Sequence, residues 1–121
     1  MQDGTTYVRF EVRRDGDTDL RFEGVPLADV SSQTNQGPDQ SRWTEIRIYR
    51  TKGGKYVVVV VGRTQWQGEH DRRAAYVCEG KKGVIDALFQ DDPYAEGEGY
   101  LSHLAKEALD EAGIDHAEEV D

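Results

Sequence analysis

The chain has one cysteine and no long hydrophobic run, and each shortage excludes a class of protein. With only Cys78, the chain cannot form an internal disulfide or a cysteine-rich metal site. The longest apolar run, residues 56–61, is far shorter than the ~20 residues that cross a bilayer. Residues 1–30 lack the basic start and apolar core of a signal peptide. We therefore expect a soluble, cytoplasmic protein that does not contact a membrane.

The sequence also lacks the motifs of common catalytic and metal sites. No pair of cysteines or histidines has the spacing of a zinc site, and no serine stands in a nucleophile elbow. The glycine-glycine-lysine stretch 53–55 is not a phosphate-binding loop, because the earlier glycine is missing and Tyr56 stands where a hydroxyl residue must. The stretch 69–71 places two carboxylates beside a histidine, but side chains of adjacent residues point in different directions. We expect no enzyme, with no catalytic residue, metal or cofactor.

The length and the pattern of the sequence are typical of one domain, 1–121, in which strands are followed by helices. Apolar and polar residues alternate in two segments on either side of a turn signal at Asp15 and Gly16, which predicts a hairpin. Polar residues with Gly37 and Pro38 predict a loop over 31–41. The five predicted strands cover 7–13, 18–24, 42–51, 56–66 and 72–79.

The glycines at 53 and 54 predict a tight hairpin between the third and fourth strands. If they are the two central residues of the turn, Ile48 lies opposite Val59 and Tyr49 lies opposite Val58. Residues directly opposite share a face of the sheet, so this register predicts two sets of neighbours. The predicted core face is Ile46, Ile48, Val57, Val59 and Val61. The predicted mixed face is Trp43, Glu45, Arg47, Tyr49, Val58 and Val60.

A further turn over 67–70 predicts the pairing of the fourth and fifth strands. With Gly68 at the first central position, Val59 lies opposite Cys78 and Val61 opposite Tyr76. Cys78 then points into the core, where a free cysteine packs as a small apolar residue.

The remainder of the chain has helical periodicity. Apolar residues recur at helical spacing over 81–90 and 99–112, and Gly113 is suited to end the second helix. An acidic tail, 114–121, follows. The predicted fold is therefore α+β, an antiparallel sheet of about five strands with both C-terminal helices packed on one face.

Charge divides the chain more sharply than its net value of −9 suggests. Residues 42–85 hold ten basic and four acidic groups, whereas residues 86–121 hold one basic and twelve acidic groups. Carboxylates spaced along a helix can imitate nucleic-acid phosphates and occupy a basic groove. The leading hypothesis is therefore a protein-binding inhibitor or regulator that engages a basic, nucleic-acid-binding partner. The residues predicted to bind it are Asp91, Asp92, Glu96, Glu98, Glu107, Asp110 and Glu111.

Two other surfaces stay open as alternatives. An aromatic and apolar patch on the sheet would suit a protein complex or a homodimer. Its predicted residues are Trp43, Arg47, Tyr49, Val58 and Val60. Basic and aromatic residues of the hairpins over 42–82 would instead suit single-stranded nucleic acid, although the net charge opposes this and cross-strand ion pairs would explain the same arginines.

Overall fold

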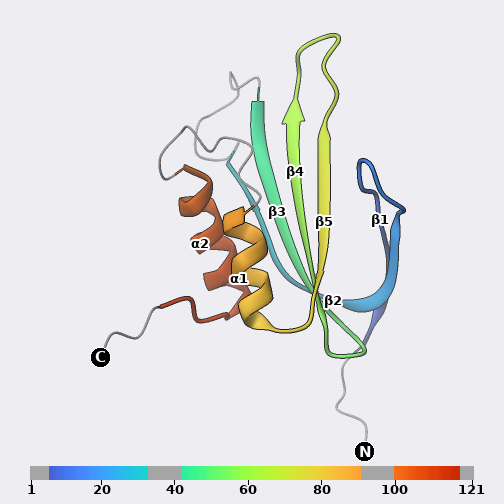
Figure 1. The fold of residues 1–121 in the computed structure, drawn as a ribbon, viewed down its shortest axis with the longest axis vertical. Helices are drawn as coiled ribbons and strands as arrows, with labels where there is room; N and C mark the ends of the chain where they lie inside the picture. Colours follow the sequence, from blue (N-terminus) through green and yellow to red (C-terminus); the bar gives the residue numbers. More distant parts are fainter. Residues whose placement is uncertain (1–5, 33–41, 91–99, 118–121) are drawn as a thin grey trace, which may run out of the picture.

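The computed structural model describes residues 6–32, 42–90 and 100–117, and it places five strands in one antiparallel sheet followed by two helices (Figure 1). The strands occur in the sheet in chain order, so each strand pairs with the strands next to it in the sequence. This confirms the predicted α+β fold. The elements are β1 (Val8–Val12), β2 (Leu20–Ser31), β3 (Arg42–Thr51), β4 (Tyr56–Thr64), β5 (Arg72–Cys78), α1 (Lys81–Gln90) and α2 (Tyr100–Ala112).

Strand β2 is much longer than predicted, because Pro26 does not interrupt it. Its first part pairs with β1 and ends at Gly24, and the rest pairs with β3 alone. A register shift between Pro26 and Ala28 marks a β-bulge. Pro26 thus lies beyond the end of β1, where a missing N–H costs no ladder hydrogen bond.

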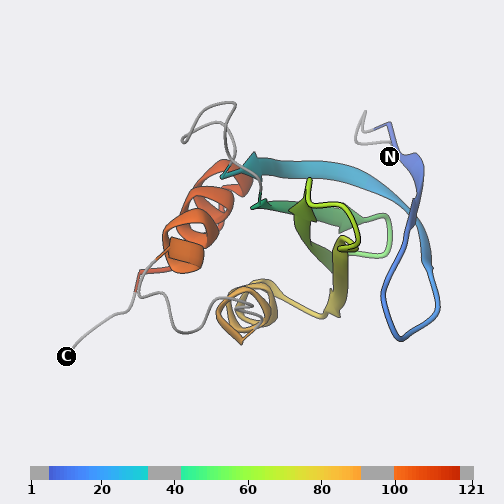
Figure 2. The same cartoon turned by 90° about the horizontal axis from the view of Figure 1, so that it is seen from above.

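The sheet curls toward a half-barrel, and Gly24 lies where β2 changes partners. Gly24 pairs with Val8 on one side and with Thr51 on the other. A Cβ added at Gly24 would lie 2.4 Å from the carbonyl oxygen of Arg50, so only glycine allows this approach. The first hairpin consequently swings away from the flat sheet and faces its concave side (Figure 2).

The turn of this hairpin reaches the opposite edge of the sheet. The Asp15 N–H donates to the Arg73 carbonyl at 2.9 Å, and the Arg73 N–H donates to Asp15 Oδ2 at 2.8 Å. These two bonds tie the β1–β2 connection to β5, which is far away in the sheet order.

The predicted register of β3 and β4 is wrong by one residue. Ile48 lies opposite Val58, and Tyr49 lies opposite Val57. The Thr51 N–H donates to the Lys55 carbonyl at 2.8 Å, so the loop has three residues, 52–54, rather than two. Gly54 has a φ of 87° while Gly53 does not have positive φ, whereas a two-residue type I′ turn needs it at both positions.

The predicted register of β4 and β5 is also wrong. Val59 lies opposite Ala75, and Cys78 lies opposite Tyr56. The connection runs over residues 65–71 and is closed by a side chain, because the Thr64 N–H donates to Asp71 Oδ1 at 3.0 Å. Cys78 is nevertheless buried in the core, as predicted.

A one-residue change of register moves every side chain of a strand to the other face, which corrects the predicted core. Ile46 and Ile48 do lie under the helices, but their β4 neighbours there are Val58 and Val60. The predicted core residues Val57, Val59 and Val61 face the concave side. Helix α1 packs over β4 and β5, and α2 over β2 and β3.

The concave side has an apolar core of its own. Tyr49 is buried there between Phe10 and Phe22, with its ring centroid 4.7 Å and 5.3 Å from theirs. The curled first hairpin thus covers the valines of β4 that the helices do not cover. Five consecutive valines are explained by two cores, one on each face of a central strand.

The second helix ends as predicted. Gly113 has a φ of 72°, its N–H donates to the Asp110 carbonyl, and the Ile114 N–H donates to the Leu109 carbonyl at 2.9 Å. This is a Schellman motif, and it returns Ile114 to the core.

Candidate binding surface

The acidic surface is only partly described by the structure. Four of the predicted residues, Asp91, Asp92, Glu96 and Glu98, lie outside the described residues. The other three are exposed on α2, and two of them have partners within the chain. Glu111 Oε1 accepts the Asp29 N–H at 3.0 Å, and Asp110 Oδ1 lies 2.8 Å from His116 Nε2. Only Glu107 has no such contact to a described residue.

The predicted sheet patch does not form a single surface. Trp43, Arg47 and Tyr49 face the concave side, whereas Val58 and Val60 are buried under the helices. The wrong register of β3 and β4 had placed these five residues together. A partner that contacts the first three therefore cannot touch the two valines of the folded chain.

The structure instead gathers arginines at the open end of the concave side. A pocket of about 250 Å³ lies between β1 and the sheet, and we call it the arginine mouth. Its floor is apolar and includes Tyr49, Val59 and Val61. Glu11 is its one acidic lining residue among those described, and it pairs with Arg21 at 3.6 Å. The basic residues that line it are Arg13, Arg47, Arg63 and Arg73.

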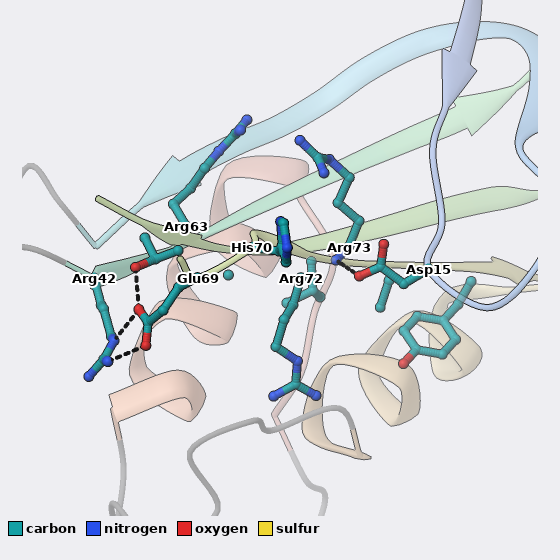
Figure 3. Close-up of a pocket in the computed structure, with 12 residues that line it drawn as sticks. Asp15, Arg42, Arg63, Glu69, His70, Arg72 and Arg73 are labelled. Carbon is teal, nitrogen blue, oxygen red and sulfur yellow. Dashed lines mark hydrogen bonds and ion pairs between the residues drawn. The ribbon is translucent and has the colours of Figure 1, made fainter. Parts of the chain in front are cut away.

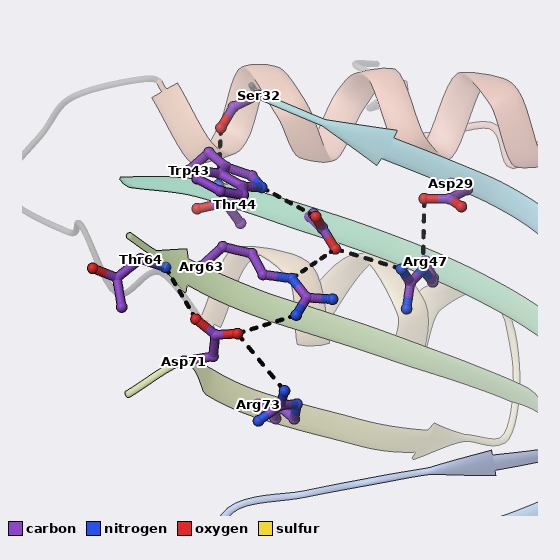
Figure 4. Close-up of polar contacts among 10 residues, drawn as sticks. Asp29, Ser32, Trp43, Thr44, Arg47, Arg63, Thr64, Asp71 and Arg73 are labelled. Carbon is purple, nitrogen blue, oxygen red and sulfur yellow. Dashed lines mark hydrogen bonds and ion pairs between the residues drawn. The ribbon is translucent and has the colours of Figure 1, made fainter. Parts of the chain in front are cut away.

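Three carboxylates hold Arg47, Arg63 and Arg73 in place (Figure 4), and the first of them, Asp29, lies 3.6 Å from Arg47 Nε. Glu45 Oε1 accepts from Arg63 Nε at 3.1 Å and from Arg47 Nη2 at 3.4 Å. Asp71 Oδ2 accepts from Arg63 Nη1 at 3.1 Å and lies 3.7 Å from Arg73 Nη2. Arg63 is thus fixed between two acids, with a third of its side chain or less exposed to solvent.

The same contacts favour the charged forms of both Asp71 and Arg63. The pKa of Asp71 is lowered by the Thr64 N–H and, against the effect of burial, by Arg63 and Arg73. Burial disfavours the charge of Arg63, yet the hydrogen bonds that it donates to Glu45 and Asp71 raise its pKa above the ordinary value. Guanidinium groups held in fixed positions lose little side-chain entropy when they bind an anion.

The floor of the mouth is buried and apolar. Burial raises the pKa of Tyr49 even though the neighbouring Arg47 acts in the opposite direction. A low dielectric beneath the guanidinium groups strengthens their attraction for a bound anion. The mouths of β-barrels are a frequent place for binding sites.

The basic hairpins are largely occupied by cross-strand ion pairs. Lys52 pairs with Glu23 at 3.7 Å and Lys55 with Glu79 at 3.3 Å. Exposed pairs of this kind contribute little stability, but they neutralise the surface that a polyanion would meet. Trp66 is 56% exposed at the end of the β4–β5 hairpin and is the aromatic residue best placed for stacking.

A larger pocket, of about 650 Å³, lies at the same end of the sheet and is lined from both sides of β5 (Figure 3). Arg42 Nε donates to Glu69 Oε1 at 3.1 Å, and this bond lowers the pKa of Glu69. Glu69 and Asp71, the carboxylates before and after His70 in the sequence, each bind an arginine, and His70 is exposed.

No set of three or more metal-ligating side chains converges within residues 6–32, 42–90 and 100–117. None of the helices in these segments has the length and apolar character needed to cross a membrane.

Sequence reasoning named Arg47 but not the arrangement around it. Arg63 and Arg73 belong to the basic residues of the hairpins over 42–82, which were considered as a nucleic-acid surface. Arg13 was not predicted to line a site. Side chains alternate between the two faces of a strand, so the sequence could have predicted that Arg63 of β4 and Arg73 of β5 share a face. That prediction requires the correct register between the two strands. Arg13 joins them through the bend of the first hairpin, which no local pattern indicates. Comparison with known proteins found no matching family model, curated protein or solved structure.

Proposed function

We propose that this protein is a non-enzymatic binding module that takes an acidic segment of a protein partner into the arginine mouth. The observation that carries the proposal is the convergence of four arginines on one pocket with a single acidic lining residue. Glu45 and Asp71 accept two of the N–H donors of Arg63, and its other N–H donors remain for the carboxylates of a partner. A planar guanidinium binds a carboxylate through two parallel hydrogen bonds, which gives direction as well as affinity.

The acidic helix surface is a second candidate that the described residues support less well. Glu111 and Asp110 each already have a hydrogen-bond partner within the chain, which leaves fewer acceptor positions for a basic protein. Nucleic acid is also disfavoured as the partner, because the net charge of −9 repels a long polyanion whereas a short acidic segment meets only the local field.

Arg13→Glu is expected to weaken binding of a glutamate-rich peptide at least tenfold. Arg13 lines the mouth and makes no ion pair or hydrogen bond with another described residue, so the change removes charge from the pocket without breaking the network. Arg9→Glu is the matched control, because Arg9 is exposed on the same hairpin but does not line the mouth. Isothermal titration at physiological salt, with a glutamine-rich peptide as the ligand control, measures the difference.

Equal weakening by the two variants would show that only overall charge matters and would reject the arginine mouth. Tighter binding of an oligonucleotide than of the acidic peptide would reject a protein partner in favour of nucleic acid.

A further inference from the structure

The arginine mouth lies beside a strand edge whose backbone groups can bind a peptide. In an antiparallel strand the N–H and C=O of one residue point to the same side, and this side alternates along the strand. Both groups of Arg73 point away from β4, because they bond to Asp15. Those of Ala75 and Val77 therefore point outward too, and neither residue has a hydrogen-bond partner on that side among the described residues.

The outer edge of β1 is also without backbone partners in the described part of the chain, but its side chains differ. Arg9 and Glu11 on β1 are both charged and exposed. Charged side chains are a usual protection of edge strands, as are prolines and bulges. Residues 74–78 of β5 have none of these, so β5 is the less protected of the two edges.

The surroundings of this edge are apolar along its length and basic at its start. Ala75 and Val77 face the concave side, where Ala75 belongs to the apolar core and Val77 is 50% exposed. Arg73 faces the same side and lines the arginine mouth. Arg72 is exposed on the other face and has no ion pair or hydrogen bond with a described side chain. An extended segment along β5 thus meets apolar side chains first and two guanidinium groups next.

On the basis of the function proposed above, we propose that the acidic segment of the partner binds as an extended strand, added in antiparallel orientation to the outer edge of β5. Strand addition to a sheet edge is a common mode of peptide binding, in which backbone hydrogen bonds supply affinity and alternate side chains supply specificity. Antiparallel pairing is the more stable of the two orientations.

The hydrogen bonds of Asp15 determine where the added strand ends. Because they occupy the outward groups of Arg73, the new ladder covers Ala75 and Val77. Side chains directly opposite share a face, so the partner residues opposite Val77 and then Ala75 are apolar. Beyond Ala75 the segment leaves the edge beside Arg72 and Arg73, and its next residues are acidic. The partner sequence is therefore apolar at two alternate positions and acidic directly after them.

Proline variants of the two edges identify the strand that pairs. Val77→Pro removes an outward N–H and no bond to β4, and it is expected to weaken peptide binding about tenfold, the upper range for one hydrogen bond. Arg9→Pro is the matched control on β1. The Lys52 N–H donates to the Glu23 carbonyl at 2.8 Å, so the groups of Glu23 point toward β3 and those of Arg9, opposite it, point outward. A larger loss from Arg9→Pro than from Val77→Pro would place the segment on β1 and overturn the proposal.

Methylation of the peptide backbone tests the pairing with the protein unchanged. The probe is a capped peptide with valine at its first and third positions, threonine at its second and fourth, and glutamate at its fifth and sixth. Methylation of the third nitrogen removes the N–H that would pair with Ala75, and about tenfold weaker binding is expected. Methylation of the second nitrogen is the control, because that N–H points away from β5 and its loss leaves the affinity unchanged. Isothermal titration at physiological salt measures both.

Equal affinities of the two methylated peptides would overturn the strand pairing. A peptide with glutamine in place of both glutamates tests the arginine mouth separately. If the glutamine peptide binds more weakly and methylation has no selective effect, the proposed function stands and the added strand fails. If the glutamine peptide binds as tightly as the original, the proposed function fails, and with it the acidic partner assigned to this edge.

Discussion

Val58→Asp is expected to unfold the protein. Val58 is completely buried under the helices, with Ile48 opposite it on β3 and Tyr76 opposite it on β5. An aspartate there would have to stay charged in an apolar core or take up a proton, and either costs several kcal/mol. Small domains are stable by only about 5–15 kcal/mol, so a loss of this size removes most of the folded population.

Circular dichroism during thermal unfolding tests this prediction. Val8→Asp is the control, because half of the Val8 side chain is exposed and its replacement is expected to change the free energy of unfolding by less than about 1 kcal/mol. A cooperative transition of Val58→Asp within a few degrees of wild type would mean that Val58 does not face the helices. The register of β3 and β4 would then be incorrect.

Gly24→Ala is expected to lower the free energy of unfolding by about 3 kcal/mol, at the upper end of the usual cost of overpacking. The added Cβ would lie 2.4 Å from the Arg50 carbonyl oxygen and 3.2 Å from the Thr51 Cα, and both are backbone atoms. The neighbouring strand cannot move away without breaking its ladder with β2. The bend that carries the first hairpin over the concave side would therefore be disturbed.

Gly53→Ala is the matched control for this change. Its added Cβ would meet nothing closer than Thr51 Oγ1 at 3.9 Å, so we expect a change within about 0.5 kcal/mol. Urea unfolding of both variants gives the comparison. Equal effects would indicate that Gly24 is not held against Arg50 and that the sheet is less curved at this point.

The order and type of the elements could be predicted because the signals are local. Alternation in the first two strands, the valine run and the helical spacing of the last segment each identify an element without knowledge of its neighbours. The second strand was predicted to end at residue 24 but continues past Pro26, because a proline interrupts a strand only where its missing N–H would face a neighbouring strand, and β1 pairs with β2 no further than Gly24.

The registers could not be predicted because they depend on loop geometry. Two adjacent glycines fit both a two-residue and a three-residue loop, and the choice moves Val58 from one face to the other. The loop over 65–71 is closed by the side chain of Asp71, which no turn rule includes. Both hairpin registers were predicted wrongly, yet Cys78 is buried in the core as predicted. A correct prediction of burial therefore does not show that the predicted strand pairing is correct.

The arginine mouth could not be predicted from the sequence for a related reason. Arg63 and Arg73 line the pocket together only in the correct strand register, and Arg13 reaches it only because β2 bends at Gly24. The bend depends on contacts between segments that are distant in the sequence. Cross-strand ion pairs were the alternative explanation for these arginines, and the pair of Arg63 with Glu45 is one of them. The sequence could not indicate that the paired arginines also line a pocket.

The most direct test of the binding proposal is to observe the arginine side chains themselves by nuclear magnetic resonance. Titration with a glutamate-rich peptide is expected to shift the Nε–H signals of Arg47, Arg63 and Arg73, while a lysine-rich peptide leaves them unchanged. The contradicting result is the reverse, in which the acidic peptide has no effect and the lysine-rich peptide shifts the backbone signals of α2 around Glu107. Binding would then belong to the acidic helix, and the arginines would serve the fold alone.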